Sequence, residues 1–242
     1  MNKVFWTTWF TEEACPAWPC PSCHAGSLAL KPATFTQTAT KESFADQEEQ
    51  WWGPENVVYS FTAWAACKNC SEEFALSGIG GVEQVPDDAH SSAYVDFYQI
   101  RHCHPTLELI SLPAKCPNLV REALAAAFAL YWLDRPSSAG RIRVALERLL
   151  DHFGIASKAE TGKFISLDKR IDVFSQSDTA NGPKLMALKW LGNVGAHTID
   201  VQANDLLAAF EVFEHVLSEV IDKKSDSIAK LAAELTAKYK HG

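Results

Sequence analysis

Four cysteines stand in two Cys-x-x-Cys pairs, Cys20–Cys23 and Cys67–Cys70. Each pair puts two thiols on one tight turn, so both sulfur atoms can reach the same metal ion. Two pairs together supply four thiolates, the ligand set that a structural zinc ion binds tetrahedrally at about 2.3 Å per Zn–S bond. The spacing C-x2-C-x43-C-x2-C therefore predicts a zinc ribbon with a long insert and a structural Zn2+ ion.

The same thiols allow other interpretations. One Cys-x-x-Cys pair can be a redox centre, and four thiols can form disulfides or stay free. The chain has 7 cysteines, and Cys15, Cys103 and Cys116 are scattered outside the two pairs. This usage is typical of a protein in the reducing cytoplasm rather than in an oxidising compartment.

Further metal ligands could come from Cys15 or from the stretch Arg101-His102-Cys103-His104. On a strand, His102 and His104 would share one face of the sheet, and Cys103 would point to the other. One strand rarely supplies a complete metal site, so a second site here is the weaker hypothesis. Whether Cys15 joins the four-cysteine site stays open.

The length of 242 residues is enough for two modest domains, and 47% apolar residues can form a sizeable core. No apolar run approaches the length of a membrane-spanning helix. The first residues, Met1 to Trp6, lack the apolar stretch of a signal peptide. We therefore expect a cytoplasmic protein without membrane contacts.

The net charge of −8 is spread unevenly. Residues 1–112 hold 5 basic and 14 acidic side chains, whereas residues 113–242 hold 17 basic and 16 acidic ones. Non-specific binding to DNA needs a basic surface. The acidic first half is thus better suited to structural support or to contact with another protein.

The first half is expected to form short strands. Val57–Trp64 is rich in β-formers and leads into the second cysteine pair, and Glu73–Leu76 leads out of it. The Gly78–Gly81 cluster is expected to be a turn rather than a nucleotide-binding loop. Tyr94–Leu112 is expected to add one or two strands.

Helical periodicity replaces the strand pattern after a hinge at Pro113–Pro117. Five or six helices in an up-and-down bundle are expected. They are placed at residues 117–133, from 137 or 138 to 154, from 166, from 183, at 204–221 and at 225–239. The predicted fold is therefore α+β, with a zinc-ribbon β domain of residues 1–112 and a helical domain of residues 113–242.

One helix carries residues that could do acid–base chemistry. Lys189, Asn193 and His197 are spaced four apart, which places them in one polar stripe of a helix. Nearby glycines would let another backbone or a ligand approach this helix closely. On an earlier helix, Arg143 and Glu147 form an i,i+4 pair.

Several short motifs in the second half resemble one uncharacterised bacterial family. That family joins an N-terminal zinc ribbon to a helical domain of the HEPN-like superfamily, alone or fused to restriction-enzyme helicase subunits. The motifs are Ser111-Leu112-Pro113, Arg121-Glu122-Ala123, Arg143-Val144-Ala145-Leu146-Glu147, Leu167 with Ile171, and Gly192-Asn193 with Ala196-His197.

The resemblance implies a helical bundle that forms a homodimer and a role in defence against foreign nucleic acid. Active HEPN-like proteins are metal-independent ribonucleases with an Arg-x(4–6)-His motif. In this chain His197 would be the general acid and base, since a histidine titrates near neutral pH. Lys189, Asn193 and Arg143 would contact the phosphate, where a cation stabilises developing charge.

The sequence departs from this nuclease motif because no arginine lies four to six residues before His197. Lys189 is the nearest preceding cation and lies one position too far. A structural alternative is a buried His197 that ties its helix end to a neighbour through Asn193 or Arg143. Whether the protein is an enzyme therefore stays open.

Three functions remain as hypotheses. The first is a dimeric, zinc-binding regulatory or interaction protein of a bacterial defence or nucleic-acid-handling system, associated with restriction–modification, with weak or no catalysis. The second is a metal-independent endoribonuclease, a toxin or effector, that uses His197. The third is a zinc-ribbon adaptor that binds a protein. The expected partners are a second copy of the chain, RNA or a protein of the defence system.

Overall fold

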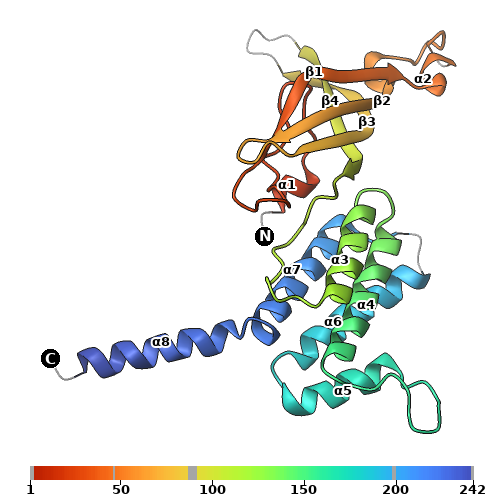
Figure 1. Cartoon of the computed structure of the whole chain (residues 1–242). Coiled ribbons are helices and arrows are strands. Elements are labelled where there is room, and N and C mark those ends of the chain that lie inside the picture. The colour runs from red at the N-terminus through yellow and green to blue at the C-terminus, as the bar shows by residue number, and fades with distance from the viewer. Residues whose placement is uncertain (1–2, 46, 87–91, 198–199, 241–242) are drawn as a thin grey trace. The chain divides into compact units, whose positions relative to one another are not determined.

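The chain folds into two units, Asn2–Glu108 and Leu109–Gly242. The structure is a computed structural model that describes residues 3–45, 47–86, 92–197 and 200–240. Within these residues the first unit contains an antiparallel four-stranded sheet, and the second contains six helices (Figure 1). The expectation of an α+β chain is confirmed.

The sheet is a meander in the order β1-β2-β3-β4, and every neighbouring pair is antiparallel. Burial alternates along β2, because successive side chains of a strand point to opposite faces. One face of the sheet therefore lies against the core and the other faces solvent. The strands are β1 (Leu28–Ala39), β2 (Val58–Cys67), β3 (Glu73–Pro86) and β4 (Ser92–His104).

Aromatic side chains form the core of the first unit. The rings of Phe61 and Phe35 stack with centroids 5.2 Å apart, and Tyr98 contacts both edge-on. Phe10 pairs with the backbone of Tyr98 at the outer edge of β4. Trp18 is 2% exposed and donates its indole N–H to the carbonyl of Phe5, which ties the segment ahead of β1 to the short helix at Val4–Thr7. The short helices here are α1 (Val4–Thr7), α2 (Lys41–Ala45) and the 3-10 helix η1 (Pro54–Asn56).

The prediction of a turn at Gly78–Gly81 is wrong, because these residues lie inside β3. Glycine is required at positions 78 and 80 by close packing and not by a chain turn. A Cβ atom on Gly78 would lie 2.1 Å from the carbonyl oxygen of Gln99 on β4, and one on Gly80 would lie 2.5 Å from the ring of Tyr98. The missing side chain of Gly80 leaves room for the ring of Tyr98 in the aromatic core, and that of Gly78 leaves room for the backbone of β4.

Six helices follow in the second unit, close to the ranges expected from the sequence. They are α3 (Asn118–Leu130), α4 (Arg135–His152), α5 (Leu167–Ser177), α6 (Gly182–His197), α7 (Ala203–Val220) and α8 (Lys224–Tyr239). Asp134 caps α4 by accepting from the backbone N–H of Ser137 at 3.0 Å, so this helix begins earlier than predicted. Ser166 caps α5 in the same way.

The helical core forms where α4 packs against α3 and α6, with α7 beside them. Gly192 lets α6 approach α4 closely, because a Cβ atom there would lie 2.6 Å from Cβ of Arg143. None of the described helices is long and apolar enough to cross a membrane. Fully buried apolar side chains include Leu124, Phe128, Ile142, Leu146, Leu149, Leu185, Phe210 and Phe213.

We expect Gly78→Ala to lower the free energy of unfolding of the first unit by about 2 kcal/mol, because the new methyl group overpacks against backbone. Chemical denaturation followed by tryptophan fluorescence measures this change. Gly81→Ala is the matched control, since its Cβ atom would lie 3.5 Å from the nearest atom, an ordinary contact. A Gly78→Ala protein as stable as the Gly81→Ala protein would contradict the packing argument.

Candidate metal centre

The two Cys-x-x-Cys turns adopt the same backbone conformation, and we call them the first knuckle (Cys20–Cys23) and the second knuckle (Cys67–Cys70). In each knuckle, the carbonyl of the first cysteine accepts a hydrogen bond from the residue after the second cysteine, at 3.0 Å. That residue is His24 or Ser71, and both have a positive φ, of 54° and 63°. The left-handed residue turns the chain sharply enough for both thiols to point to one side.

The sheet brings the knuckles together. β2 runs into the second knuckle and β3 leaves it, so this turn closes a hairpin. Four residues separate the first knuckle from β1, whose first residue, Leu28, pairs with Cys67. The backbone N–H of Lys68 also donates to the carbonyl of Ser27 at 3.0 Å. Antiparallel pairing of β1 with β2 therefore places two turns far apart in sequence side by side.

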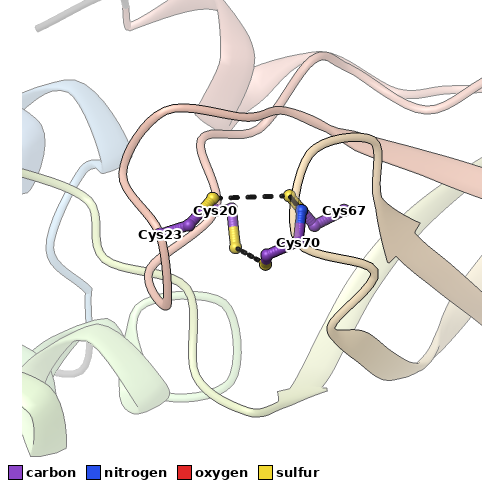
Figure 2. Close-up of side chains that lie close together, drawn as sticks. All are labelled: Cys20, Cys23, Cys67 and Cys70. Carbon is purple, nitrogen blue, oxygen red and sulfur yellow. Dashed lines mark hydrogen bonds between the residues drawn. The ribbon is translucent and has the colours of Figure 1, made fainter.

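Figure 2 shows the four thiols converging from the two knuckles. The sulfur atoms all lie within 4.8 Å of one another. Sγ of Cys20 lies 3.7 Å from Sγ of Cys70, and Sγ of Cys23 lies 3.6 Å from Sγ of Cys67. A zinc ion with four bonds of about 2.3 Å needs sulfur atoms about 3.8 Å apart. A disulfide needs about 2.05 Å, so the arrangement fits a shared ion and not cystine.

Asn69 supports the thiolates from the second knuckle. Its side-chain amide donates to Sγ of Cys23 at 3.5 Å, and its backbone N–H donates to Sγ of Cys67 at 3.4 Å. The amide of Asn69 is the largest cause that lowers the pKa of Cys23 to about 6. The backbone N–H of Cys70 is the largest cause that lowers the pKa of Cys67. Hydrogen bonds thus favour the charged, metal-binding form of two sulfur atoms.

Charge repulsion acts on the fourth sulfur. A hydrogen bond from the Glu72 backbone lowers the pKa of Cys70, but burial and the neighbouring thiols outweigh it and raise this pKa to about 12. Four thiolates in so small a volume repel one another. A bound cation removes this repulsion, since a coordinating thiol is deprotonated outright. The cluster therefore needs a positive ion to hold all four sulfur atoms in their charged form.

Gly26 leaves space for the second knuckle. A Cβ atom on Gly26 would lie 2.6 Å from Sγ of Cys67 and 2.7 Å from Cβ of Asn69. Its carbonyl accepts from the backbone N–H of Cys20 at 2.9 Å. The sequence analysis missed both Gly26 and Asn69, although Asn69 stands inside the Cys-x-x-Cys motif and the glycine follows the first knuckle by three residues.

The cluster is closed chemically. Cys20 and Cys67 are buried, Cys23 is intermediate and Cys70 is exposed, and four sulfur ligands would fill the tetrahedral shell of a bound zinc ion. With four protein ligands no position would be left for water or substrate, as is typical of structural and not of catalytic zinc sites.

The remaining metal candidates stay apart from this cluster. Cys20, Cys23, Cys67 and Cys70 form the one group of three or more potential ligands found in the described part of the chain. Cys15 and Cys103 are therefore outside it. On β4, His102 and His104 are exposed whereas Cys103 is buried, as expected for alternating side chains of a strand.

The residues that the sequence placed in one helical site make two separate sets of contacts. Arg143 on α4 donates to the side-chain oxygen of Asn193 on α6 and pairs with Glu147 at 3.3 Å. Lys189 is 3% exposed and forms an ion pair with Asp168 on α5. This hydrogen bond from Lys189 is the main cause that lowers the pKa of Asp168. The side chain of His197 lies outside the described residues.

Asp168 is the functional-site neighbour that sequence reasoning missed. It lies two residues after the cap of α5, where an acidic side chain favours the helix N-terminus, and this position gives no hint of a partner on α6. Its pairing explains why Lys189 is buried, because a buried cation needs a nearby opposite charge. Lys189 thus links two helices, and Arg143 links α4 to Asn193.

Two family models match the chain, one in each half. Residues 8–105 match a family described as Domain of unknown function (DUF8608), and residues 125–240 match one described as Domain of unknown function (DUF4145). The chain is thus similar to uncharacterised domain families, which confirms the expected resemblance at that level. The stretch between the two matches includes the junction of the two structural units, at Glu108 and Leu109. No curated protein and no solved structure matches the chain.

We expect Asn69→Ala to make the metal centre more sensitive to acid. Without the amide hydrogen bond the pKa of Cys23 rises, so protons compete with the metal at a higher pH. A hydrogen bond to a charged group contributes about 1.5 kcal/mol, which corresponds to a shift of about one pH unit in the midpoint of metal release. A chromogenic chelator records this midpoint in a pH titration. Ser22→Ala, an exposed change in the first knuckle, should leave it in place, and equal midpoints for both variants would contradict the role of Asn69.

Proposed function

We propose that this chain is a zinc-binding regulatory or interaction protein in which a structural Zn2+ ion holds the β unit together. The observation that carries the proposal is the convergence of four thiols with sulfur separations of 3.6 and 3.7 Å between the knuckles. Zinc suits this donor set because it accepts four thiolates in a tetrahedron and has no redox chemistry. The zinc-ribbon interpretation of the first unit rests on the same arrangement.

The helical unit would supply interactions. We propose that it has a HEPN-like fold and forms a homodimer, and that the protein belongs to a bacterial defence or nucleic-acid-handling system in the cytoplasm. This part of the proposal rests on the resemblance of the sequence motifs. The order of six helices and the pairing of Arg143 with Asn193, two residues of those motifs, are compatible with it.

The burial and pairing of Lys189 and Arg143, the candidate phosphate-binding cations, favour weak or absent catalysis. Lys189 is almost fully buried and paired with Asp168, and Arg143 is engaged by Asn193 and Glu147. A cation that stabilises a phosphate must exchange such partners for the substrate. These contacts support an interaction role over a nuclease role.

Metal analysis tests the leading proposal. We expect one zinc ion per chain in the purified protein, and we expect Cys67→Ser to lose the ion and to unfold the β unit, since metal binding and folding form one equilibrium in such modules. Plasma emission spectroscopy measures the metal content, and circular dichroism measures folding. Cys15→Ser is the matched control and should keep the ion. A metal-free wild-type protein with a stable β unit would overturn the proposal.

An endoribonuclease is the second candidate function. The observation that favours it is the position of Arg143 against Asn193 on α6, the helix whose last residue is His197. On this hypothesis the purified protein cuts RNA in excess EDTA, and His197→Ala loses at least about 100-fold of the rate, the usual contribution of a general acid or base. Lys184→Ala, a change elsewhere on α6, serves as the control. Equal cleavage by wild type and His197→Ala would exclude this candidate.

A protein-binding adaptor is the third candidate. The excess of acidic over basic side chains in residues 1–112 favours a basic protein surface as its target. Capture of a protein that survives nuclease treatment would support it only if loss of the first unit abolished the capture.

A further inference from the structure

Two histidines of β4 lie on the solvent-facing side of the sheet. His102 and His104 are exposed, whereas Cys103 between them is buried and its thiol donates to the carbonyl of Pro105 at 3.3 Å. Residues two apart in a strand share one face, about 6.7 Å apart for a rise of about 3.4 Å per residue. The two imidazoles therefore stand on the same side of β4, and we call them the β4 histidine pair.

A β-bulge sets this orientation. Ile100 is 1% exposed and His102 is exposed, although residues two apart in a regular strand lie on the same face. His102 pairs with Ser77 of β3. The next residue of β3, Gly78, pairs with Ile100, so β4 holds one extra residue between the two pairs. Bulges of this kind redirect side chains and are frequent next to functional sites. Here the bulge turns the β4 histidine pair out of the core.

The space around the pair is open. Ser77 and Ala75 of β3 lie directly opposite His102 and His104, and both are small. In the part of the chain that the structure describes, neither imidazole makes a hydrogen bond or an ion pair. An ion with metal–nitrogen bonds of about 2.05 Å in a tetrahedron needs the ring nitrogens about 3.3 Å apart. Rotation of the two rings toward each other closes the difference from the backbone separation.

We propose that the β4 histidine pair binds one exchangeable divalent transition-metal ion of the class that prefers imidazole nitrogen, which includes Zn2+, Ni2+ and Cu2+. The pair is not part of the four-cysteine cluster, so this inference goes beyond the proposed structural zinc. Two imidazoles leave the other positions of the ion to water or to a further donor. Cu2+ binds most tightly of the three, because affinity for a given site follows the order Ni2+ < Cu2+ > Zn2+.

The charge of the surroundings favours a cation. On β2, Thr62 and Trp64 pair with Ser77 and Ala75, so the positions across the sheet from the pair carry no charge. Residues 1–112 hold 14 acidic and 5 basic side chains, and a net negative surface raises the local concentration of cations. Two nitrogen donors hold an ion less tightly than four thiolates. Purification therefore removes this ion, and one tightly bound zinc ion per chain remains the expected content.

A copper probe tests the pair in the full-length, zinc-loaded protein. We titrate it with Cu2+–iminodiacetate, whose own donors fill part of the copper shell, so that the probe selects sites with two neighbouring donors. Electron paramagnetic resonance should show one copper per chain with two imidazole nitrogens. His102→Ala and His104→Ala should each raise the dissociation constant at least about tenfold. His152→Ala, which removes an exposed histidine of α4, is the matched control and should leave it unchanged.

A relocated ligand tests the geometry. In the His104→Ala protein, adding Ser77→His should restore binding, because position 77 lies directly opposite His102 and paired residues have Cβ atoms about 5 Å apart. Thr62→His in the same background is the matched control. Position 62 lies one strand further from His102, about 9.6 Å away at a strand spacing of about 4.8 Å, and should not restore binding.

Each other outcome overturns the inference. A wild-type protein that binds no probe up to millimolar concentration has no such site. Binding that survives His102→Ala or His104→Ala belongs to other donors, and equal weakening by His152→Ala marks non-specific surface binding. Failure of Ser77→His to restore the probe contradicts the placement of His102 beside position 77. The zinc content of every variant checks that the β unit stays folded, and loss of the copper site alone leaves the structural zinc proposal intact.

Discussion

Convergence of four cysteine thiols from two distant turns is the constraint around which the β unit is built. Two turns separated by 43 residues hold their sulfur atoms within 4.8 Å of one another, so a cation would be needed to keep all four of them charged. Two neighbouring residues support the cluster. The amide of Asn69 donates to a cysteine sulfur, and Gly26 leaves room for the second knuckle. Because Leu28 of β1 pairs with Cys67, the position of the cluster is coupled to the register of β1 against β2.

The β unit and the helical unit use charge differently. In the first, four thiols converge, and an external cation would be needed to hold all of them as thiolates. In the second, opposite charges are paired between helices, as Lys189 with Asp168 and Arg170 with Asp151. Arg170 is 4% exposed, and breaking either pair would leave a charge in a poorly solvated place. The polar groups of the bundle therefore act first as links between helices, and any role toward a ligand must compete with these links.

The sequence predicted elements that local patterns determine. The helix placed from residue 166 begins there in the structure, and the strand into the second knuckle followed from a run of β-formers, whereas the start of α4 after Asp134 was missed. The cysteine spacing named four residues whose thiols lie together in the structure. Long-range packing was beyond these patterns. The glycines at 78 and 80 signal a turn locally, but glycine is required there by close neighbours on another strand, the backbone of Gln99 for Gly78 and the ring of Tyr98 for Gly80.

In the helical unit, too, the sequence did not predict which residues of different helices are in contact. A spacing of four correctly places Lys189 and Asn193 one turn apart on α6, yet their partners come from α5 and α4. Helical spacing reports which residues share a face, and it does not report which neighbour that face meets. The sequence therefore did not predict the pairing of Asp168. An acidic residue is common in the first turn of a helix, so its presence there indicates no partner on another helix.

The location of the second knuckle has a consequence for how the β unit assembles. This knuckle closes the hairpin of β2 and β3, so two sulfur ligands are set in place by contacts between residues near in sequence. The first knuckle joins through β1, after a much longer loop has closed, and longer loops cost more entropy to close. An ion captured by the hairpin would thus act as a template for the remaining strand. The order of assembly, and not only the final stability, would then follow the supply of metal in the cell.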